Sequence, residues 1–160
     1  MLDPGTIKVD PLVAYTDAPG KVGELVVYDH GTYGRQILRL IRNTSGATVA
    51  TALLHQFESG SSLNTLVAAA GAMKENLGGL AQCAVLDDEY AYVVVDGDAL
   101  ATADAAVAAN AALSVRTATA SGRVDDLAVT TVAILQAVCA WSVGSAALAG
   151  DTLRVRVKLL

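Results

Sequence analysis

Three consecutive acids, Asp87, Asp88 and Glu89, are the first candidates for chemistry in this chain of 160 residues. Adjacent carboxylates can act as general acid and base where burial moves the pKa of one of them. Here the acids separate two β-rich runs, one over 81–86 and the other over 90–95. This pattern predicts a hairpin with the acids at its solvated tip. Because water reaches such a tip, we interpret the three acids as a turn rather than a catalytic site.

The other side chains that could do chemistry stand apart from one another. His30 and His55 have no acidic or cysteine partner at the spacing of metal ligands. Cys83 and Cys139 lie far apart in apolar segments, which indicates two buried free thiols in a reducing compartment. The acids at 96–98 match only part of a calcium loop, and their central glycine is expected to end the second β-rich run. We therefore expect no enzyme, no metal site and no cofactor.

The charge pattern argues against nucleic acid and membrane as partners. The net charge is −5, and the eleven cations are scattered rather than gathered in a basic stripe. Residues 127–150 are uncharged and long enough to cross a bilayer, but they contain Thr, Gln and Ser and lack a flanking cationic cluster. Buried strands are therefore the favoured interpretation of that stretch. The first residues also lack the pattern of a secretion signal.

The composition indicates a core of small side chains and a surface that another molecule covers. Apolar residues make up 53% of the chain, yet there is only one Phe and one Trp. Charged residues make up 17%, below the roughly 25% of ordinary soluble domains. Such a surface is typical of a protein that packs against copies of itself or against a partner. We therefore expect a homo-oligomer, and a homotrimer as its form.

The C-terminus alternates apolar and cationic residues with a strict period of two. One face carries Leu153, Val155, Val157 and Leu159, and the other carries Arg154, Arg156 and Lys158. This period predicts a strand with one face in the core. The three cations could contact an acidic partner, or they could protect an edge strand from unwanted pairing.

The first 20 residues combine proline punctuation with apolar side chains. The prolines are Pro4, Pro11 and Pro19, and the apolar residues that could contact a capsid or a neighbouring subunit are Leu2, Ile7, Val9 and Leu12. Prolines exclude a helix, while the apolar residues favour an extended arm that lies along another surface. A first strand packed on its own domain is the alternative. We expect an arm over 1–20 and a single β-rich domain over 21–160.

Three segments have a pattern compatible with helix. Residues 61–79 space their apolar side chains at helical intervals, and this predicts one short helix. Residues 35–42 fit a helix or a strand equally well. Residues 99–115 are rich in alanine, which favours a helix, although their Thr, Val and Asn permit short strands. The expected fold is thus mainly β, a small barrel or sandwich with one short helix.

Four motifs in a fixed order resemble the small decoration, or cement, proteins of tailed-bacteriophage heads. They are GLAQCAVLDDEYAYVVVDG at 79–97, AAVAANAALSV at 105–115, SGRVDD at 121–126 and LAGDTLRVRVKLL at 148–160. Asn110 stands where glycine is common in these proteins; because Asn tolerates a left-handed backbone, the turn is expected to survive.

The resemblance implies a structural protein of the virion, made in the cytoplasm of the bacterial host. It would bind the major capsid protein on the outer surface of the head as a homotrimer and stabilise the shell. Many copies that bind only the assembled lattice can do this without any catalytic group. Two alternatives stay open: another virion component, such as a tail or neck protein, and a cytosolic small-molecule-binding β-barrel or enzyme.

Overall fold

The chain folds into strands, turns and irregular segments. A computed structural model describes residues 9–57, 64–67, 77–115, 122–126 and 138–160, and these residues include no helix. The mainly β class expected from the alternating sequence runs is therefore confirmed.

Eleven strands occur in the part of the chain that the structure describes. The first six are β1 (Ala14–Tyr15), β2 (Leu25–His30), β3 (Gly34–Asn43), β4 (Leu54–Phe57), β5 (Asn64–Val67) and β6 (Leu77–Leu80). The other five are β7 (Tyr90–Thr102), β8 (Ala112–Val115), β9 (Val124–Asp126), β10 (Ala140–Ser142) and β11 (Thr152–Lys158).

The strands form one sheet in the order β2-β3-β5-β4-β6-β7-β11-β10-β8-β9, and β1 pairs with β7. All pairs are antiparallel except β3 with β5. Strand β3 also pairs with β7, so the sheet folds back on itself. Its outermost strands, β2 and β9, remain unpaired with each other, and the described sheet as a whole does not close into a barrel.

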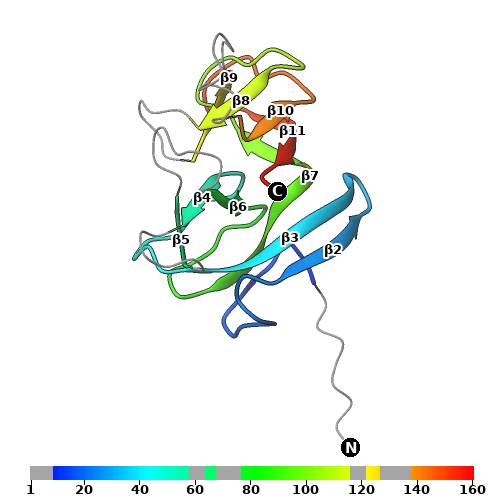
Figure 1. Ribbon diagram of the computed structural model, residues 1–160. Coiled ribbons are helices and arrows are strands. Elements are labelled where there is room, and N and C mark those ends of the chain that lie inside the picture. The colour runs from blue at the N-terminus through cyan, green and yellow to red at the C-terminus, as the bar shows by residue number, and fades with distance from the viewer. Residues whose placement is uncertain (1–8, 58–63, 68–76, 116–121, 127–137) are drawn as a thin grey trace, which may run out of the picture.

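Strand β7 connects the two halves of the molecule. It runs through 13 residues from the half that holds β2 to β6 to the half that holds β8 to β10 (Figure 1). Its first part pairs with β3 and its second part pairs with β11. The expectation that Gly97 ends this run is wrong. Gly97 instead has a φ of 110° and pairs with Val157 of β11, close to the point where the β3 register shifts, and the strand continues to Thr102.

The core is built from Leu, Val and Ala, with Tyr92 as its largest buried side chain. One cluster of buried side chains includes Leu38 on β3 as well as Val155 on β11. The Tyr92 ring meets that of Tyr15 edge-on at 6.1 Å between centroids, and its hydroxyl donates to Glu24 Oε1 at 3.0 Å. Burial, with the hydrogen bond to Glu24, raises the pKa of Tyr92 to about 12.

The short helix expected over 61–79 is wrong wherever the structure describes that segment. Asn64–Val67 is strand β5 and Leu77–Leu80 is strand β6, whereas 61–63 and 68–76 lie outside the described residues. Strand β5 pairs with β3 on one side and with β4 on the other, so both edges of its main chain are paired with neighbouring strands. Sheet pairing of this kind overrides the helical spacing of the side chains.

The two segments whose sequence fits either a helix or a strand, 35–42 and 99–115, contain strands in the structure. Residues 35–42 lie within β3. In the Ala-rich segment, residues 99–102 end β7 and residues 112–115 form β8. Between them Asn110 has a φ of 62°, the left-handed conformation expected at that turn.

The acid cluster forms a turn, as its sequence setting predicted. Asp87 and Asp88 are exposed turn residues. Each acid accepts a hydrogen bond: Asp87 from Gly46 N at 2.9 Å, Asp88 from Arg42 Nη2 at 2.8 Å, and Glu89 from Leu86 N at 2.9 Å. Their carboxylates thus stabilise the turn and its contact with the end of β3.

Only one arm of the expected hairpin is a regular strand. Residues 90–95 belong to β7, but 81–86 form no continuous strand, and Val85 makes a single bridge to Val49. Asn43 holds this segment through its side chain, because its buried amide Nδ2 donates to the carbonyls of Ala47, Val85 and Leu86. The segment before the turn is therefore attached to the end of β3 by a side chain.

Candidate interaction surface

Charged side chains of β7 and β11 face one another in an ordered array. In the antiparallel register, Arg156 lies opposite Asp98 and Lys158 lies opposite Asp96. Because side chains alternate along a strand, these residues and Arg154 share one face. Lys158 Nζ donates to Asp96 Oδ2, and the two arginines donate to Asp98.

Asp98 is the centre of this array. Its side chain is 6% exposed, while those of Arg154 and Arg156 are 42% and 66% exposed. Oδ2 accepts from Arg154 Nε at 3.0 Å and Nη2 at 2.6 Å, and Oδ1 accepts from Arg156 Nε at 2.7 Å. Burial alone would raise the pKa of Asp98, but the hydrogen bonds and charges of Arg156 and Arg154 outweigh it and lower that pKa below its usual value.

An open pocket of about 430 Å³ lies beside this array. Residues of the β2–β3 turn, of the start of β3, of β7 and of β11 line it: Thr32, Tyr33, Gly34, Arg35, Asp96, Gly97, Asp98, Arg154 and Arg156. Gly97 brings β7 close to β3, since a Cβ atom there would lie 2.8 Å from the carbonyl oxygen of Arg35. The pocket is thus lined mainly by polar residues, and Gly97 permits the close approach of β7 to β3 within it.

The β2–β3 turn is held in place by aromatic and imidazole contacts. His30 Nδ1 accepts hydrogen bonds from the main-chain nitrogens of Thr32 at 3.0 Å and Tyr33 at 3.3 Å. The His30 and Tyr33 rings lie 4.6 Å apart between centroids. The Arg154 guanidinium lies 5.6 Å from the centroid of the Tyr33 ring, within the range of a cation–π contact. These contacts link the turn to β11.

The C-terminal residues adopt the predicted register. Leu153, Val155 and Val157 are buried, and Arg154, Arg156 and Lys158 are exposed. The interpretation of these cations as protection for an edge strand is wrong, because β11 lies between β7 and β10. Contact with a partner stays a prediction, and the structure adds that Asp96 and Asp98 already bind the three cations.

Of the four apolar residues predicted to make contacts in the N-terminal arm, the structure describes two. Leu2 and Ile7 lie outside the described residues. Val9 is half-buried against the core cluster, whereas Leu12 is 55% exposed. Within 9–20, β1 pairs with the start of β7, which corresponds to the alternative of a strand packed on its own domain. The arm as a unit, and its contact with a partner, remain predictions.

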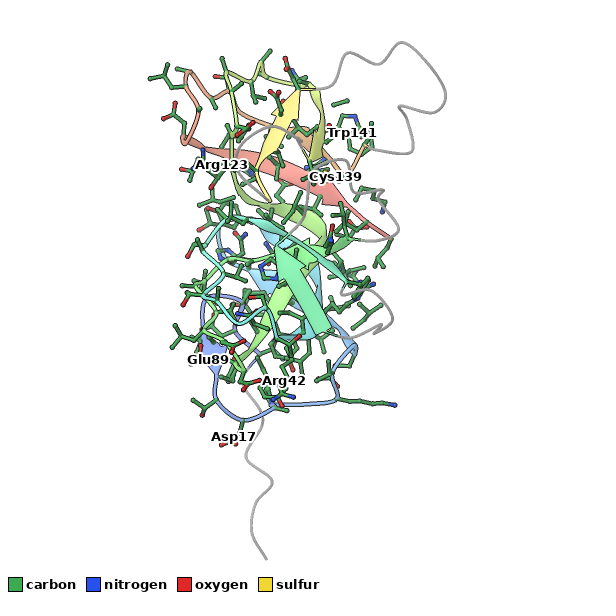
Figure 2. The ribbon with its side chains drawn as sticks, turned by 90° about the vertical axis from the view of Figure 1, so that its left-hand side faces the viewer. Asp17, Arg42, Glu89, Arg123, Cys139 and Trp141 are labelled. Carbon is green, nitrogen blue, oxygen red and sulfur yellow. The ribbon has the colours of Figure 1, made fainter. Side chains whose placement is uncertain are left out.

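The opposite end of the molecule exposes large apolar side chains. Figure 2 shows Trp141, Cys139 and Arg123 in the half of the molecule away from Asp17, Arg42 and Glu89. Trp141 is 45% exposed and Leu148, on the loop before β11, is 69% exposed. Large exposed apolar side chains on ordered segments are typical of contact surfaces.

The remaining candidates for chemistry form no metal cluster within the part of the chain that the structure describes. That part contains no group of three or more His, Cys, Asp or Glu residues placed to hold a metal ion. Cys139 is buried as expected, whereas Cys83 is only half-buried; burial raises the pKa of the Cys83 thiol to about 11, with smaller contributions from Glu89 and Asp10. Burial lowers the pKa of His55 to about 4.

The uncharged stretch 127–150 is described only in part. Residues 127–137 lie outside the described residues, and 140–142 form β10. Val138, Cys139 and Ala140 are buried, as expected for buried strands, but Trp141, Val143 and Leu148 are exposed, so the expectation is wrong for most of 141–150. Among the described residues, none of the elements is a helix with the length and apolar character needed to cross a membrane.

Sequence reasoning missed the acidic half of the array and the aromatic wall of the pocket. Asp96 and Asp98 were considered as calcium ligands and not as partners of the C-terminal cations. A signal was present, because the acids at 96 and 98 have the same period of two as the cations at 154, 156 and 158. Pairing the last strand antiparallel to 96–102 would have joined them. No comparable signal pointed to Tyr33 or Arg35.

Comparisons with known proteins bear on the fold. No family model matches the chain, and no curated protein matches it. The mainly β architecture has a counterpart among solved structures of phage proteins. The chain is similar to the crystal structure of the N base of head fiber gp8.5 in bacteriophage phi29, with a TM-score of 0.53 and 11% identity. The match covers 85% of this chain and 96% of that one, and at this identity it shows a shared fold.

Proposed function

We propose that this protein is a structural component of a bacteriophage virion, carried on the head. The observation that carries the proposal is the fold shared with a head fiber base over 96% of that chain. The sequence motifs at 79–97, 105–115, 121–126 and 148–160 support it separately, since they resemble decoration proteins of phage heads. A structural role also suits an interaction surface made of ion pairs and exposed apolar side chains.

On the head, we propose that the protein binds the major capsid protein at the outer surface and stabilises the shell. A protein that binds the assembled lattice more tightly than free subunits shifts the equilibrium toward the lattice. We further propose a homotrimer, because contact between copies could cover exposed apolar side chains such as Trp141 and Leu148. Three copies would also bind the lattice with greater avidity than one.

Attachment through the N-terminal end is the simplest arrangement. At that end Leu12 and Val13 are exposed beside β1, which pairs with the protein's own β7. In the sequence, Leu2 and Ile7 precede them as further apolar side chains. The N-terminal end would then bind the shell, and the end with Trp141 would remain for contact between copies.

Sedimentation with purified particles tests the proposal. The protein should sediment with assembled heads of its own virus and should not bind unassembled capsid protein. A chain without residues 1–8, or with Leu12→Asp, should bind heads more weakly and keep its melting temperature, while Thr16→Asp, at an exposed site nearby, should behave like the native chain. Binding to tails or necks and not to heads would support the alternative virion component and overturn the head assignment.

A further inference from the structure

The pocket beside the β7–β11 array carries more positive charge than its acids neutralise. Arg35, Arg154 and Arg156 line it with Asp96 and Asp98, and Lys158 binds Asp96 from the adjacent position on β11. The chain as a whole has a net charge of −5, so a local excess of cations is unusual for this molecule. The pocket therefore attracts a negatively charged group although the rest of the protein repels it.

Guanidinium donors remain available in the pocket. Arg154 and Arg156 each bind Asp98 through Nε and Nη2, and their Nη1 groups make no hydrogen bond within the described residues. Arg35 is exposed, and among the described residues it forms no ion pair, although Asp29 lies opposite it on β2. The whole guanidinium of Arg35 and the Nη1 groups of Arg154 and Arg156 are thus available to a ligand in the pocket.

The pocket is preorganised for such a ligand. Asp98 fixes the two arginines of β11, and the Tyr33 ring contacts the Arg154 guanidinium. His30 holds the main chain of the turn that carries Tyr33. Because Arg154, Arg156 and Tyr33 are already ordered, binding has to immobilise mainly Arg35, which lowers its cost in conformational entropy.

We propose that this pocket binds a carboxylate side chain from an acidic segment of a partner protein, with Arg35 as the main recognition group. The two oxygens of a carboxylate match the planar donor geometry of a guanidinium. A nucleic acid fits less well, because its closely spaced phosphates would meet Asp96 and Asp98 as well as the arginines. This inference deepens the proposed function, in which the acidic segment would belong to the shell.

A peptide titration tests the ligand class in the absence of a capsid shell. A negative result would therefore overturn the carboxylate pocket without bearing on the proposal that the protein is carried on the head. Hexaglutamate peptide is added to ¹⁵N-labelled protein, and the amide resonances of Gly34 and Gly97 are followed. We expect saturable shifts at both positions, with no such shifts for hexaglutamine peptide. Arg35→Gln should weaken binding by about tenfold, whereas Lys21→Gln, at an exposed cation outside the pocket lining, should leave it unchanged.

Two further readouts keep the test independent of how the variant folds. Binding by the native chain should weaken as salt rises from about 50 to about 300 mM, because exposed charges are screened. A short DNA duplex should bind more weakly than the peptide at equal salt. The proposal is overturned if hexaglutamate causes no shifts at Gly34 and Gly97, or if hexaglutamine causes equal ones. It is also overturned if the Arg35→Gln variant binds hexaglutamate as tightly as the native chain, or if that binding does not depend on salt. Tighter binding of the DNA duplex than of the peptide would overturn it as well.

Discussion

The carboxylate of Asp98 on β7 accepts a hydrogen bond from Nε of Arg156 on β11 at 2.7 Å. This contact connects the strand that runs through both halves of the molecule to the C-terminal strand. The acid is buried and the arginine is exposed, so the pair lies where the core meets the proposed binding pocket. The stability of the sheet and the shape of the pocket therefore depend on the same residues.

Replacing Asp98 with Asn should destabilise the protein by about 1 to 2 kcal/mol, measured by urea denaturation. The change removes the charge that holds Arg154 and Arg156 together, and solvent around the two arginines limits the loss. Asp17→Asn, at an exposed acid, is the control and should change the free energy of unfolding by less than about 0.5 kcal/mol. Equal stability of D98N and the native chain would show that the array contributes nothing.

Acid should remove the contribution of Asp98. The pKa of this carboxyl is lower in the folded chain than its ordinary value of 3.8, so its contribution is complete above that pH. The contribution is lost as the pH falls through the lower folded pKa. The stability difference between the native chain and D98N should therefore shrink as the pH falls below about 4. A difference that stays constant over this range contradicts the assignment.

His55 should produce a separate loss of stability at milder pH. Its pKa is about 4 in the folded chain because of burial, against 6.5 for an ordinary histidine. Between these values the unfolded chain binds a proton that the folded chain does not, so stability falls as the pH falls. We expect a loss of about 2 kcal/mol from pH 7 to about pH 5, measured by denaturation. His55→Gln should abolish this slope, and an unchanged slope in the variant would show that His55 is not its source.

Val155→Asp should destabilise the protein by about 3 to 5 kcal/mol, because it puts an unpaired charge in the core. Val155 is fully buried, at 0% exposure, between β7 and β10. Thr152→Asp, at an exposed position of the same strand, is the matched control and should leave the melting temperature nearly unchanged. The same melting temperature for V155D and the native chain would contradict the observed register of β11.

Gly97→Ala should destabilise the protein and close the pocket. The added methyl group would lie 2.8 Å from the carbonyl oxygen of Arg35, and the φ of +110° is unfavourable for alanine. We expect a loss of about 2 kcal/mol. Gly31→Ala is the matched control, since no atom lies within 4 Å of its added methyl group. Similar melting temperatures for the two variants would contradict the close approach of β7 to β3.

The sequence predicts those parts of the fold that depend on alternation and turn chemistry. The C-terminal strand, the acid turn and the left-handed Asn110 follow from local patterns that the structure confirms. The helix expected at 61–79 and the break expected at Gly97 are wrong, because both depend on pairing with strands distant in sequence. Pairing of Asp98 with Arg154 and Arg156 spans 56 and 58 residues, so the matching period of two in the two segments reveals it only when the last strand is paired with β7.

Electron cryomicroscopy of purified heads, with and without added protein, tests the central claim most directly. The measurement is the difference density between the two reconstructions. If the protein is a structural component of the virion head, density that fits the elongated two-part fold should appear on the outer surface, attached by the N-terminal end. Identical reconstructions at saturating protein concentration would contradict the assignment.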